Sequence, residues 1–328
     1  MFCERSDPEV RVLRALLDSP SLSCSREALS AESGLSSAAV EEAISHLGEC
    51  GLPLVASAES GWRLNPPLPD VLSGEELLAR SGEEVSLPWS AVVYDRVGST
   101  SDILLRMEAA GLPEGVVVVA ERQTRGRGRL GRRWESDSSG GIYASFLLRP
   151  NLSLTQVHRL TILTTVAAAE AVEEVAGFSV KIKWPNDLIG SRGKLGGILT
   201  EVAAKGGSVR GGVVGIGLNV SQELESFSEE IRGRVSSIRI ETGHSFRRVE
   251  ILGSFLRRMA IRYRSDFGES RRLWEWRCES LGKMVRVRQG DGIVEGYALG
   301  LDEDGLLLLR TEAGVVVPLL AGELRSAD

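Results

Sequence analysis

The 328-residue sequence predicts a multidomain α+β protein with a winged helix-turn-helix, a central α/β domain with a mixed sheet, and a small C-terminal β-barrel. Helical periodicity runs through the N-terminal region and ends in two short extended stretches. Strands and helices then alternate, and the chain finishes in short strands separated by glycine turns, as in small barrels. We place the domains at 1–66, 86–278 and 279–328, with a linker at 67–85.

The N-terminal region has the spacing of a helix-turn-helix followed by a hairpin. Gly34 marks the turn between the second and third helices, and the stretch S-A-E-S-G separates the two strands. A generic helical cap of the same length is the alternative to a winged helix-turn-helix. The expected elements are helices at Val10–Leu17, Arg26–Glu32 and Ser37–Gly48 and strands at Leu54–Ala56 and Trp62–Leu64.

The central and C-terminal elements follow a proline-rich segment. N-P-P-L-P at Asn65–Pro69 fits neither a helix nor a central strand, so we interpret it as a linker that leads to a short helix at Gly74–Arg80. The expected central elements are strands at Ala91–Asp95, Val116–Glu121, Ile142–Leu148, Val180–Trp184, Gly196–Val202 and Val209–Val220 and helices at Ser101–Ala110, Thr155–Ala176 and Val249–Asp266. The expected C-terminal strands are Lys283–Arg288, Ile293–Leu301, Leu306–Arg310 and Val315–Leu319.

Composition excludes several classes of protein. The 4 cysteines and 3 histidines are far apart and form no C-x-x-C pair, which argues against a disulfide framework, a zinc ribbon or a metal cluster. No stretch has the roughly 20 apolar residues of a membrane span, and the N-terminus lacks the pattern of a signal peptide. We therefore expect a cytoplasmic protein without membrane contact. Its net charge of -6 disfavours broad nucleic-acid binding but allows a local basic site.

The segment Glu121–Trp134, E-R-Q-T-R-G-R-G-R-L-G-R-R-W, concentrates positive charge in this acidic chain. No helix follows its G-x-G-x-x-G spacing, and Asn151 stands where a dinucleotide site needs an acidic residue. A disordered basic tract is a second interpretation, but strands bound the segment on both sides. The third is a mobile loop that an anion orders. In that case glycines admit the ligand, arginines bind phosphate or carboxylate, and Trp134 stacks on a base.

Two further motifs predict a site for a nucleotide and a carboxylate. K-W-P-N-D-L at Lys183–Leu188 would present Asn186 and Asp187 at a rigid turn, to a ribose hydroxyl or to Mg²⁺. G-K-L-G-G-I-L-T-E at Gly193–Glu201 places Lys194 beside glycines that admit a substrate closely. The sequence shows no Ser/His/Asp or Cys/His set. The chemistry that fits is attack of one bound substrate on another, such as a carboxylate on the α-phosphate of ATP.

Together these motifs resemble those of the biotin protein ligases that carry an N-terminal winged helix. The resemblance covers nearly the whole chain and implies a biotin/lipoate-ligase-like catalytic domain and an SH3-like C-terminal barrel. It implies that biotin and ATP give biotinyl-5′-AMP and pyrophosphate, and that a lysine of a biotin carboxyl carrier protein then attacks the adenylate. The motifs are G-S-T-S-D at Gly98–Asp102, Q-T-R-G-R-G-R-L-G-R-R-W at Gln123–Trp134, K-W-P-N-D at Lys183–Asp187, G-K-L-G-G-I-L at Gly193–Leu199, G-I-G-L-N-V at Gly215–Val220 and G-L-D-E-D-G-L-L-L at Gly300–Leu308.

The resemblance also implies roles for individual residues. Lys194 and Arg129 are expected to be catalytic, and biotin, ATP and Mg²⁺ are the expected ligands, with no metal-binding residue identified. The expected biotin contacts are Ser99, Thr100, Ser101, Gln123, Arg127, Gly128, Arg129 and Lys194. The expected ATP contacts are Arg129, Arg132, Trp134, Asn186, Asp187, Lys194 and Asn219.

The N-terminal region departs from the family members that repress transcription. Residues 21–64 hold two arginines against six glutamates, and the expected recognition helix has no lysine or arginine. Phosphate contacts dominate DNA affinity, so this charge disfavours DNA binding. Ser36, Ser37 and His46 are the candidate DNA contacts. Operator binding and a retained structural domain both stay open, and the resemblance allows a homodimer.

Three other functions compete with biotin ligation. Lipoate ligases and octanoyltransferases share the catalytic scaffold, although the W-P-N-D turn and the arginine segment favour biotin. A non-catalytic, biotin-sensing DNA-binding regulator is the second alternative, and the intact Lys194 argues against it. An RNA-binding protein is the third, which the acidic composition and the lack of interleaved aromatic residues disfavour.

Overall fold

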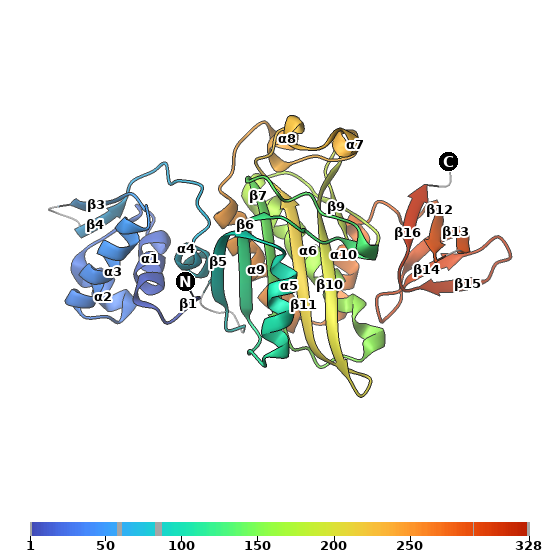
Figure 1. The fold of residues 1–328 in the computed structure, drawn as a ribbon, viewed down its shortest axis with the longest axis horizontal. Coiled ribbons are helices and arrows are strands. Elements are labelled where there is room, and N and C mark those ends of the chain that lie inside the picture. The colour runs from blue at the N-terminus through green and yellow to red at the C-terminus, as the bar shows by residue number, and fades with distance from the viewer. Residues whose placement is uncertain (1, 58–60, 83–86, 291, 327–328) are drawn as a thin grey trace.

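The computed structural model describes residues 2–57, 61–82, 87–290 and 292–326, in three parts along its long axis (Figure 1). A helical N-terminal part lies at one end, a large sheet with helices lies in the centre, and a small sheet lies at the C-terminal end. The predicted start of the central domain at residue 86 falls outside the described residues. Across the described ranges, no helix has the length and apolar character needed to cross a membrane.

Three helices and a three-stranded sheet form the N-terminal part, as far as the structure describes it. Serine hydroxyls cap two helices: Ser25 Oγ accepts from Ala28 N at 3.1 Å, and Ser36 Oγ accepts from Ala39 N at 3.3 Å. Gly34 ends α2 at φ 65°, the left-handed conformation that the turn requires. The predicted helices and hairpin are confirmed. The elements are α1 (Pro8–Asp18), β2 (Ser23–Cys24), α2 (Arg26–Ser33), α3 (Ser37–Glu49), β3 (Leu54–Ser57) and β4 (Gly61–Leu64), in the strand order β2-β4-β3.

The first residues of the chain belong to the central sheet, which the sequence did not predict. β1 (Phe2–Glu4) pairs antiparallel with β5 (Ser90–Val97), and Cys3 lies opposite Ala91. Three residues are too few to show a strand's alternation, so no local signal was present. The described chain thus contributes residues 2–4 to the central sheet, forms the helical part and returns to the same sheet at β5.

A mixed sheet forms the centre of the molecule, with eight strands in the described residues. β5 and β6 run parallel, and the other neighbouring pairs are antiparallel. The order is β1-β5-β6-β7-β11-β10-β9-β8, so the K-W-P-N-D turn joins the last two strands at one edge. The strands after β5 are β6 (Val116–Gln123), β7 (Gly141–Leu148), β8 (Lys181–Lys183), β9 (Asp187–Ile189), β10 (Lys194–Lys205) and β11 (Ser208–Asn219).

Helices cover both faces of this sheet. Successive strand residues point to opposite sides, and apolar side chains on each side are buried under a helix. On one face, Val118 and Leu147 pack with Leu104 of α5. On the other, Phe146 contacts Phe255 of α9 with ring centroids 5.5 Å apart. α5 is shorter than the strands it covers (Figure 1). The site described below includes residues at the N-terminus of this helix. The helices are α5 (Thr100–Ala109), α6 (His158–Ala176) and α9 (Arg248–Arg264).

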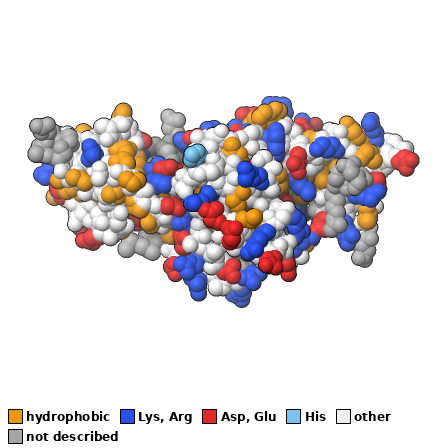
Figure 2. All heavy atoms as spheres, turned by 90° about the horizontal axis from the view of Figure 1, so that it is seen from above, with side chains coloured by type: hydrophobic (Ala, Val, Ile, Leu, Met, Phe, Trp, Pro, Cys, Tyr) orange, Lys and Arg blue, Asp and Glu red, His pale blue; other side chains and the backbone are white. Residues whose placement is uncertain are grey.

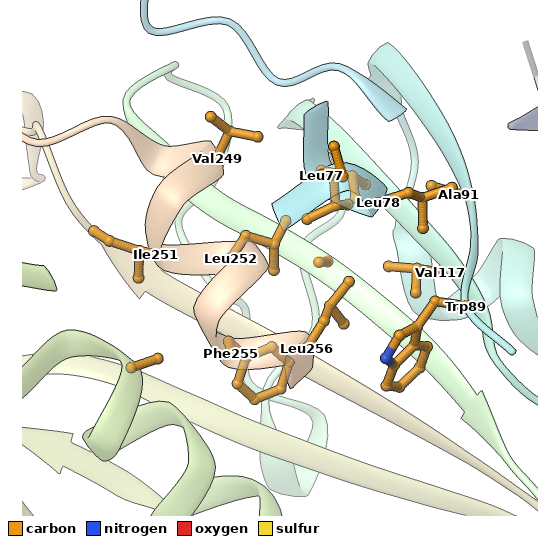
Figure 3. Close-up of a cluster of buried hydrophobic side chains, with 14 of the residues drawn as sticks. Leu77, Leu78, Trp89, Ala91, Val117, Val249, Ile251, Leu252, Phe255 and Leu256 are labelled. Atoms are coloured by element: carbon orange, nitrogen blue, oxygen red, sulfur yellow. The ribbon is translucent and has the colours of Figure 1, made fainter. Parts of the chain in front are cut away.

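The linker is packed against the central domain. Leu77 of α4 (Gly74–Arg80) joins Leu252 of α9 in one buried cluster (Figure 3). Arg248, at the start of α9, forms an ion pair with Asp70 at 2.8 Å. The N-terminal part is therefore attached through both a strand and a buried helix.

A five-stranded antiparallel sheet forms the C-terminal part within the described residues, in the order β15-β14-β13-β12-β16. It packs against α10 through a core that includes Trp274, Val285 and Leu307. The four predicted strands are confirmed, whereas α10 and β16 were not predicted. The elements are α10 (Phe267–Arg277), β12 (Met284–Gln289), β13 (Gly292–Leu301), β14 (Leu307–Arg310), β15 (Val316–Leu319) and β16 (Glu323–Ser326).

Candidate active site

A cavity of about 730 Å³ opens beside the N-terminus of α5. Its walls come from α5, the arginine segment, the β8–β9 turn, β10, β11, the connection from β11 to α9, and the C-terminal sheet. Its size suits a small molecule or cofactor. All the residues predicted to contact biotin or ATP line it: Ser99, Thr100, Ser101, Gln123, Arg127, Gly128, Arg129, Arg132, Trp134, Asn186, Asp187, Lys194 and Asn219. Their individual roles remain predictions.

One end of the cavity is a neutral, hydrogen-bonding compartment at the start of α5. The hydroxyls of Thr100 and Ser101 lie 2.8 and 3.0 Å from Ser145 Oγ. Thr100 N donates to Gln123 Oε1 at 2.8 Å. These residues and Ser99 are buried. Because hydroxyls both donate and accept, this end suits an uncharged polar group of a ligand.

The arginine segment forms a tight loop between β6 and β7. Gly128 N donates to Arg132 O at 2.7 Å, and Trp134 N donates to Gly126 O at 3.0 Å. A Cβ on residue 126 would lie 2.4 Å from Trp134 O, so this position requires glycine. Leu130, at the tip, has φ 57° and is 71% exposed. The loop thus stands over the cavity with an apolar tip in solvent.

The arginines of this loop have partners in the protein. Arg127 pairs with Asp102 at 2.7 Å and with Glu201 at 2.6 Å, and Arg132 pairs with Glu323 of the C-terminal sheet. The sequence predicts a loop in which the arginines repel one another. In the structure, carboxylates from α5, β10 and β16 reduce that repulsion. The Arg127 guanidinium, a predicted biotin contact, therefore already has two carboxylate partners in the protein.

Arg129 differs from its neighbours because its hydrogen-bond partner is neutral. Its Nη1 donates to Asn186 Oδ1 at 3.1 Å, while Asn186 Nδ2 donates to Ile198 O at 2.6 Å. Burial lowers the pKa of the Arg129 guanidinium, and the Asp187 carboxylate offsets part of that effect. A partly buried guanidinium beside an amide favours binding of an anionic ligand.

Lys194 and Trp134 form the other end of the cavity. Lys194 Nζ lies 2.7 Å from Asp187 Oδ1 and 5.4 Å from the centroid of the Trp134 ring. A Cβ on Gly217 would lie 2.6 Å from that ring, so the glycine is what lets Trp134 lie on the sheet. Trp134 Nε1 is buried and has no hydrogen-bond partner in the described part of the chain. This end combines a cation, an aromatic ring and an open donor.

The backbone of Lys194 is held by the connection between β11 and α9. Lys194 N donates to Arg234 O, and Ser236 N donates to Lys194 O, both at 2.9 Å. Asn219 Nδ2 donates to Ser236 O at 3.0 Å, so this predicted nucleotide contact also holds the cavity wall. The connection contains α7 (Glu229–Arg232) and α8 (Ile238–Thr242), which were not predicted.

Several lining residues were not predicted. Ser145, Arg234, Glu279 and residues 322–324 line the cavity, as does Lys183. The signal available for Lys183 was its place in the K-W-P-N-D motif. The contact with residues 322–324 had none, because it joins the end of the chain to a loop nearly two hundred residues earlier.

The candidate DNA contacts lie in the N-terminal part, away from the cavity. Ser36 caps α3, and Ser37 is exposed at the start of that helix. His46 Nδ1 lies 2.8 Å from Glu9 Oε1 of α1, and this hydrogen bond raises the pKa of His46. Ser36 and His46 therefore already serve the fold of this part, and Ser37 is the candidate with no such contact shown.

The described residues contain no group of three or more His, Cys, Asp or Glu side chains placed to hold a metal ion. The Asp187 carboxylate is paired with Lys194. A resident metal site does not fit this arrangement. Mg²⁺ commonly reaches such sites on substrate phosphates, and we treat it here as part of the ATP substrate.

Residues 93–219 match the model of the biotin/lipoate A/B protein ligase family, and residues 280–324 match that of the biotin protein ligase C terminal domain. The chain belongs to the biotin/lipoate A/B protein ligase family. Among its relatives, the bifunctional ligase/repressor BirA of Bacillus spizizenii is 35% identical over 287 residues, covering 86% of this chain and 87% of that protein. The biotin–[acetyl-CoA-carboxylase] ligase of Mycobacterium tuberculosis is 33% identical over 273 residues, covering 80% and 97%.

A solved structure has the same fold over most of the chain. The biotin protein ligase from Aquifex aeolicus, in complex with biotin and ATP, superposes with a TM-score of 0.62 at 33% identity. The match covers 72% of this chain and 99% of that one. The family predicted from the sequence motifs is confirmed.

Proposed function

We propose that the protein is an ATP-dependent biotin protein ligase. The biotin carboxylate attacks the α-phosphorus of ATP, which forms biotinyl-5′-AMP and releases pyrophosphate. The ε-amine of a carrier-protein lysine then attacks the carbonyl carbon, AMP leaves with the bonding electrons, and the amide nitrogen loses a proton. One observation carries the proposal: a single cavity joins a neutral compartment at Thr100 and Ser145 to a cationic one at Arg129 and Lys194.

The neutral compartment fits the ureido ring of biotin. That ring is uncharged and carries both N–H donors and a carbonyl acceptor. The buried hydroxyls of Thr100, Ser101 and Ser145 and the amide of Gln123 supply complementary groups. Discrimination by such groups is strong, because a ligand that leaves them unpaired loses their hydrogen bonds.

Arg129 and Lys194 support adenylation by charge. Attack on the α-phosphorus brings an anionic carboxylate toward an anionic phosphate, so positive groups held in place lower the barrier. Asp187 and the Trp134 ring fix the Lys194 ammonium, and Asn186 fixes the Arg129 guanidinium. No protein nucleophile is required, since the two substrates react with each other.

The arginine loop also has a role between the two steps. The mixed anhydride hydrolyses if water reaches it, and a loop that covers the cavity protects it until the carrier arrives. Arg129 and Trp134 line the same cavity and belong to this loop. The loop is therefore proposed to retain the adenylate as well as to assist its formation.

Biotin transfer to a carrier tests the proposal. The protein, biotin, ATP and Mg²⁺ are incubated with a biotin carboxyl carrier domain of acetyl-CoA carboxylase. We expect the mass of one biotinyl group on one lysine of the carrier, and none when ATP is omitted. A lipoyl group transferred in place of biotin would establish the lipoate-ligase alternative on the same scaffold.

The remaining assignments belong to the same proposal. The carrier is that of acetyl-CoA carboxylase or a related carboxylase, and the protein works in the cytoplasm, where ATP is present and the four free cysteines stay reduced. The domain bounds 1–66, 86–278 and 279–328 follow the sequence, with the last an SH3-like barrel, except that β1 (Phe2–Glu4) pairs with the central sheet. The family resemblance allows a homodimer.

We further propose that the N-terminal part is a winged helix-turn-helix, with α3 in the position of a recognition helix and β3–β4 as the wing. A role in repression is favoured by the name of the Bacillus spizizenii relative. Charge disfavours it: α3 has no lysine or arginine, and few blue side chains appear on the N-terminal end in Figure 2. A gel shift with DNA upstream of the biotin genes distinguishes a repressor domain from a structural domain. A biotin-dependent complex supports repression, and its absence supports a structural domain.

A further inference from the structure

We propose that Lys183 binds the pyrophosphate leaving group of ATP during adenylation. The inference rests on the proposed ligase function and adds a residue to those assigned to ATP above. Lys183 is the last residue of β8 and lines the cavity. Its position, its lack of a protein partner and the chemistry of the leaving group each support the assignment.

Strand register places the Lys183 side chain on the cavity face. Lys183 pairs directly with Asp187, Asp187 with Gly197, and Gly197 with Gly217. Residues directly opposite each other in antiparallel strands have side chains on the same face. That face is the one covered by Trp134, because a Cβ on Gly217 would lie 2.6 Å from the Trp134 ring. The row runs from a lysine, through a carboxylate, to two glycines that leave room for a ligand.

Lys183 is a cation that the protein leaves unpaired. Within the described residues, the Lys183 ammonium has no hydrogen bond, ion pair or ring contact to another side chain, and the residue is partly buried. The nearby Asp187 is paired with Lys194 at 2.7 Å. An anion in the cavity would therefore give the Lys183 ammonium a partner that the protein does not provide.

The backbone at Lys183 is well anchored. Ile182, the preceding residue, is fully buried, and its carbonyl accepts from Glu279 N at 2.9 Å. Lys181 differs from Lys183 although both lie on β8. Lys181 is exposed, does not line the cavity, and has its Nζ 5.4 Å from the Trp276 ring. It is the matched control.

The chemistry gives this cation a purpose. When the carboxylate bonds to the α-phosphorus, the bond from that phosphorus to the bridging oxygen breaks, and its electron pair leaves with pyrophosphate. An ammonium is a compact point charge suited to phosphate oxygens. Arg129 and Lys194 are assigned to the reacting carboxylate and α-phosphate, so Lys183 serves the leaving group. Losing such a charged contact is expected to weaken the interaction with the leaving group about 10- to 100-fold.

The test separates the two half-reactions in the full-length protein. For Lys183→Ala we expect pyrophosphate release at low ATP to fall about 10- to 100-fold, with biotin binding unchanged. In the reverse reaction, where pyrophosphate attacks biotinyl-5′-AMP to give ATP and biotin, the pyrophosphate needed for half-maximal rate should rise by a similar factor. Transfer from supplied biotinyl-5′-AMP to the carrier should stay at the wild-type rate. Lys183→Arg should keep most of the activity, and Lys181→Ala should match the wild type.

Two results would overturn the assignment. One is an unchanged pyrophosphate dependence in Lys183→Ala. The other is an equal loss in adenylation and in transfer, which would indicate a structural role for Lys183. Failure of the ligase function itself is distinguishable, because the wild-type protein would then release no pyrophosphate with biotin.

Discussion

At the scale of the residue, the cavity holds cations in different electrostatic settings. The Lys194 ammonium is paired with a carboxylate, whereas the Arg129 guanidinium is partly buried beside a neutral amide. A cation paired with a carboxylate keeps its position in the absence of ligand, whereas a partly buried cation whose direct hydrogen-bond partner is neutral gains most when an anion binds. We therefore expect Lys194 to act mainly in catalysis and Arg129 to act in both binding and retention.

Replacing Lys194 by alanine should slow adenylation about 10²- to 10³-fold, the usual effect of removing one group that stabilises transition-state charge. The fold should persist, because the backbone bonds of Lys194 to Arg234 and Ser236 do not involve its side chain. Pyrophosphate release and circular dichroism measure the two effects. A wild-type rate in this variant would remove Lys194 from the mechanism.

Replacing Arg129 by glycine should weaken retention of biotinyl-5′-AMP. The variant loses a guanidinium from the loop over the cavity, so the adenylate escapes and acylates free lysines on unrelated proteins. Labelling of serum albumin added to the reaction measures this escape. Tight retention with no labelling of albumin would contradict the role of the loop.

At the scale of the element, short helix α8 holds the turn that carries Lys194. Glu241 accepts hydrogen bonds from Ser191 N at 2.9 Å, Ser191 Oγ at 2.6 Å and Arg192 N at 3.0 Å. Burial disfavours the charged form of Glu241, but these hydrogen bonds outweigh it and lower its pKa. Its stabilising contribution is therefore fully present near neutral pH and is lost only as the pH falls through the lowered pKa.

Glu241→Gln should reduce the rate of adenylation about tenfold, the effect of losing a hydrogen bond to a charged group. The substituted amide puts a donor against the Arg192 N–H, so the turn before Lys194 shifts. Biotin affinity should change little, because the compartment at α5 does not touch this turn. Steady-state kinetics, with biotin varied and then with ATP varied, measure the adenylation rate and the biotin affinity separately. Glu229→Gln, at a side chain 92% exposed on α7, is the control. Equal losses in the two variants would contradict the prediction.

The contact between α1 and α3 should depend on pH. The hydrogen bond that the His46 ring donates to the Glu9 carboxylate raises the pKa of His46 above its ordinary value of 6.5. Because the pKa is raised, the contribution of the His46–Glu9 ion pair to folding stability is fully present below pH 6.5. That contribution is lost as the pH rises through the folded-state pKa. Hydrogen exchange in α1 and α3 at about pH 6 and about pH 8 should show a gap between wild type and His46→Gln that narrows at the higher pH. A gap independent of pH would show that the ion pair contributes nothing.

For the whole molecule, local motifs predicted the residues of the site. The contacts between segments that are distant in the sequence could not be predicted. The motifs around Arg129, Asn186 and Lys194 are contiguous, and each combines residue types whose chemistry is recognisable in isolation. The pairing of β1 with β5, and of Arg132 with Glu323, joins segments that are distant in the sequence. Neither pairing leaves a periodic signal, because three residues of strand or one ion pair are too short to show one.

The same contacts connect the three parts. The C-terminal sheet contributes residues 322–324 to the cavity, and β1 and α4 attach the N-terminal part to the central domain. The cavity is therefore a property of the assembled molecule, and the central domain alone lacks one of its walls.

The most direct test of biotin ligation is pyrophosphate release from ATP without any carrier protein, measured with biotin and separately with lipoate. We predict release with biotin, biotinyl-5′-AMP bound to the protein by mass, and no release with lipoate. Release with lipoate alone would contradict the assignment of the substrate. Release with neither would contradict the assignment of a ligase and leave a sensor that has lost its chemistry.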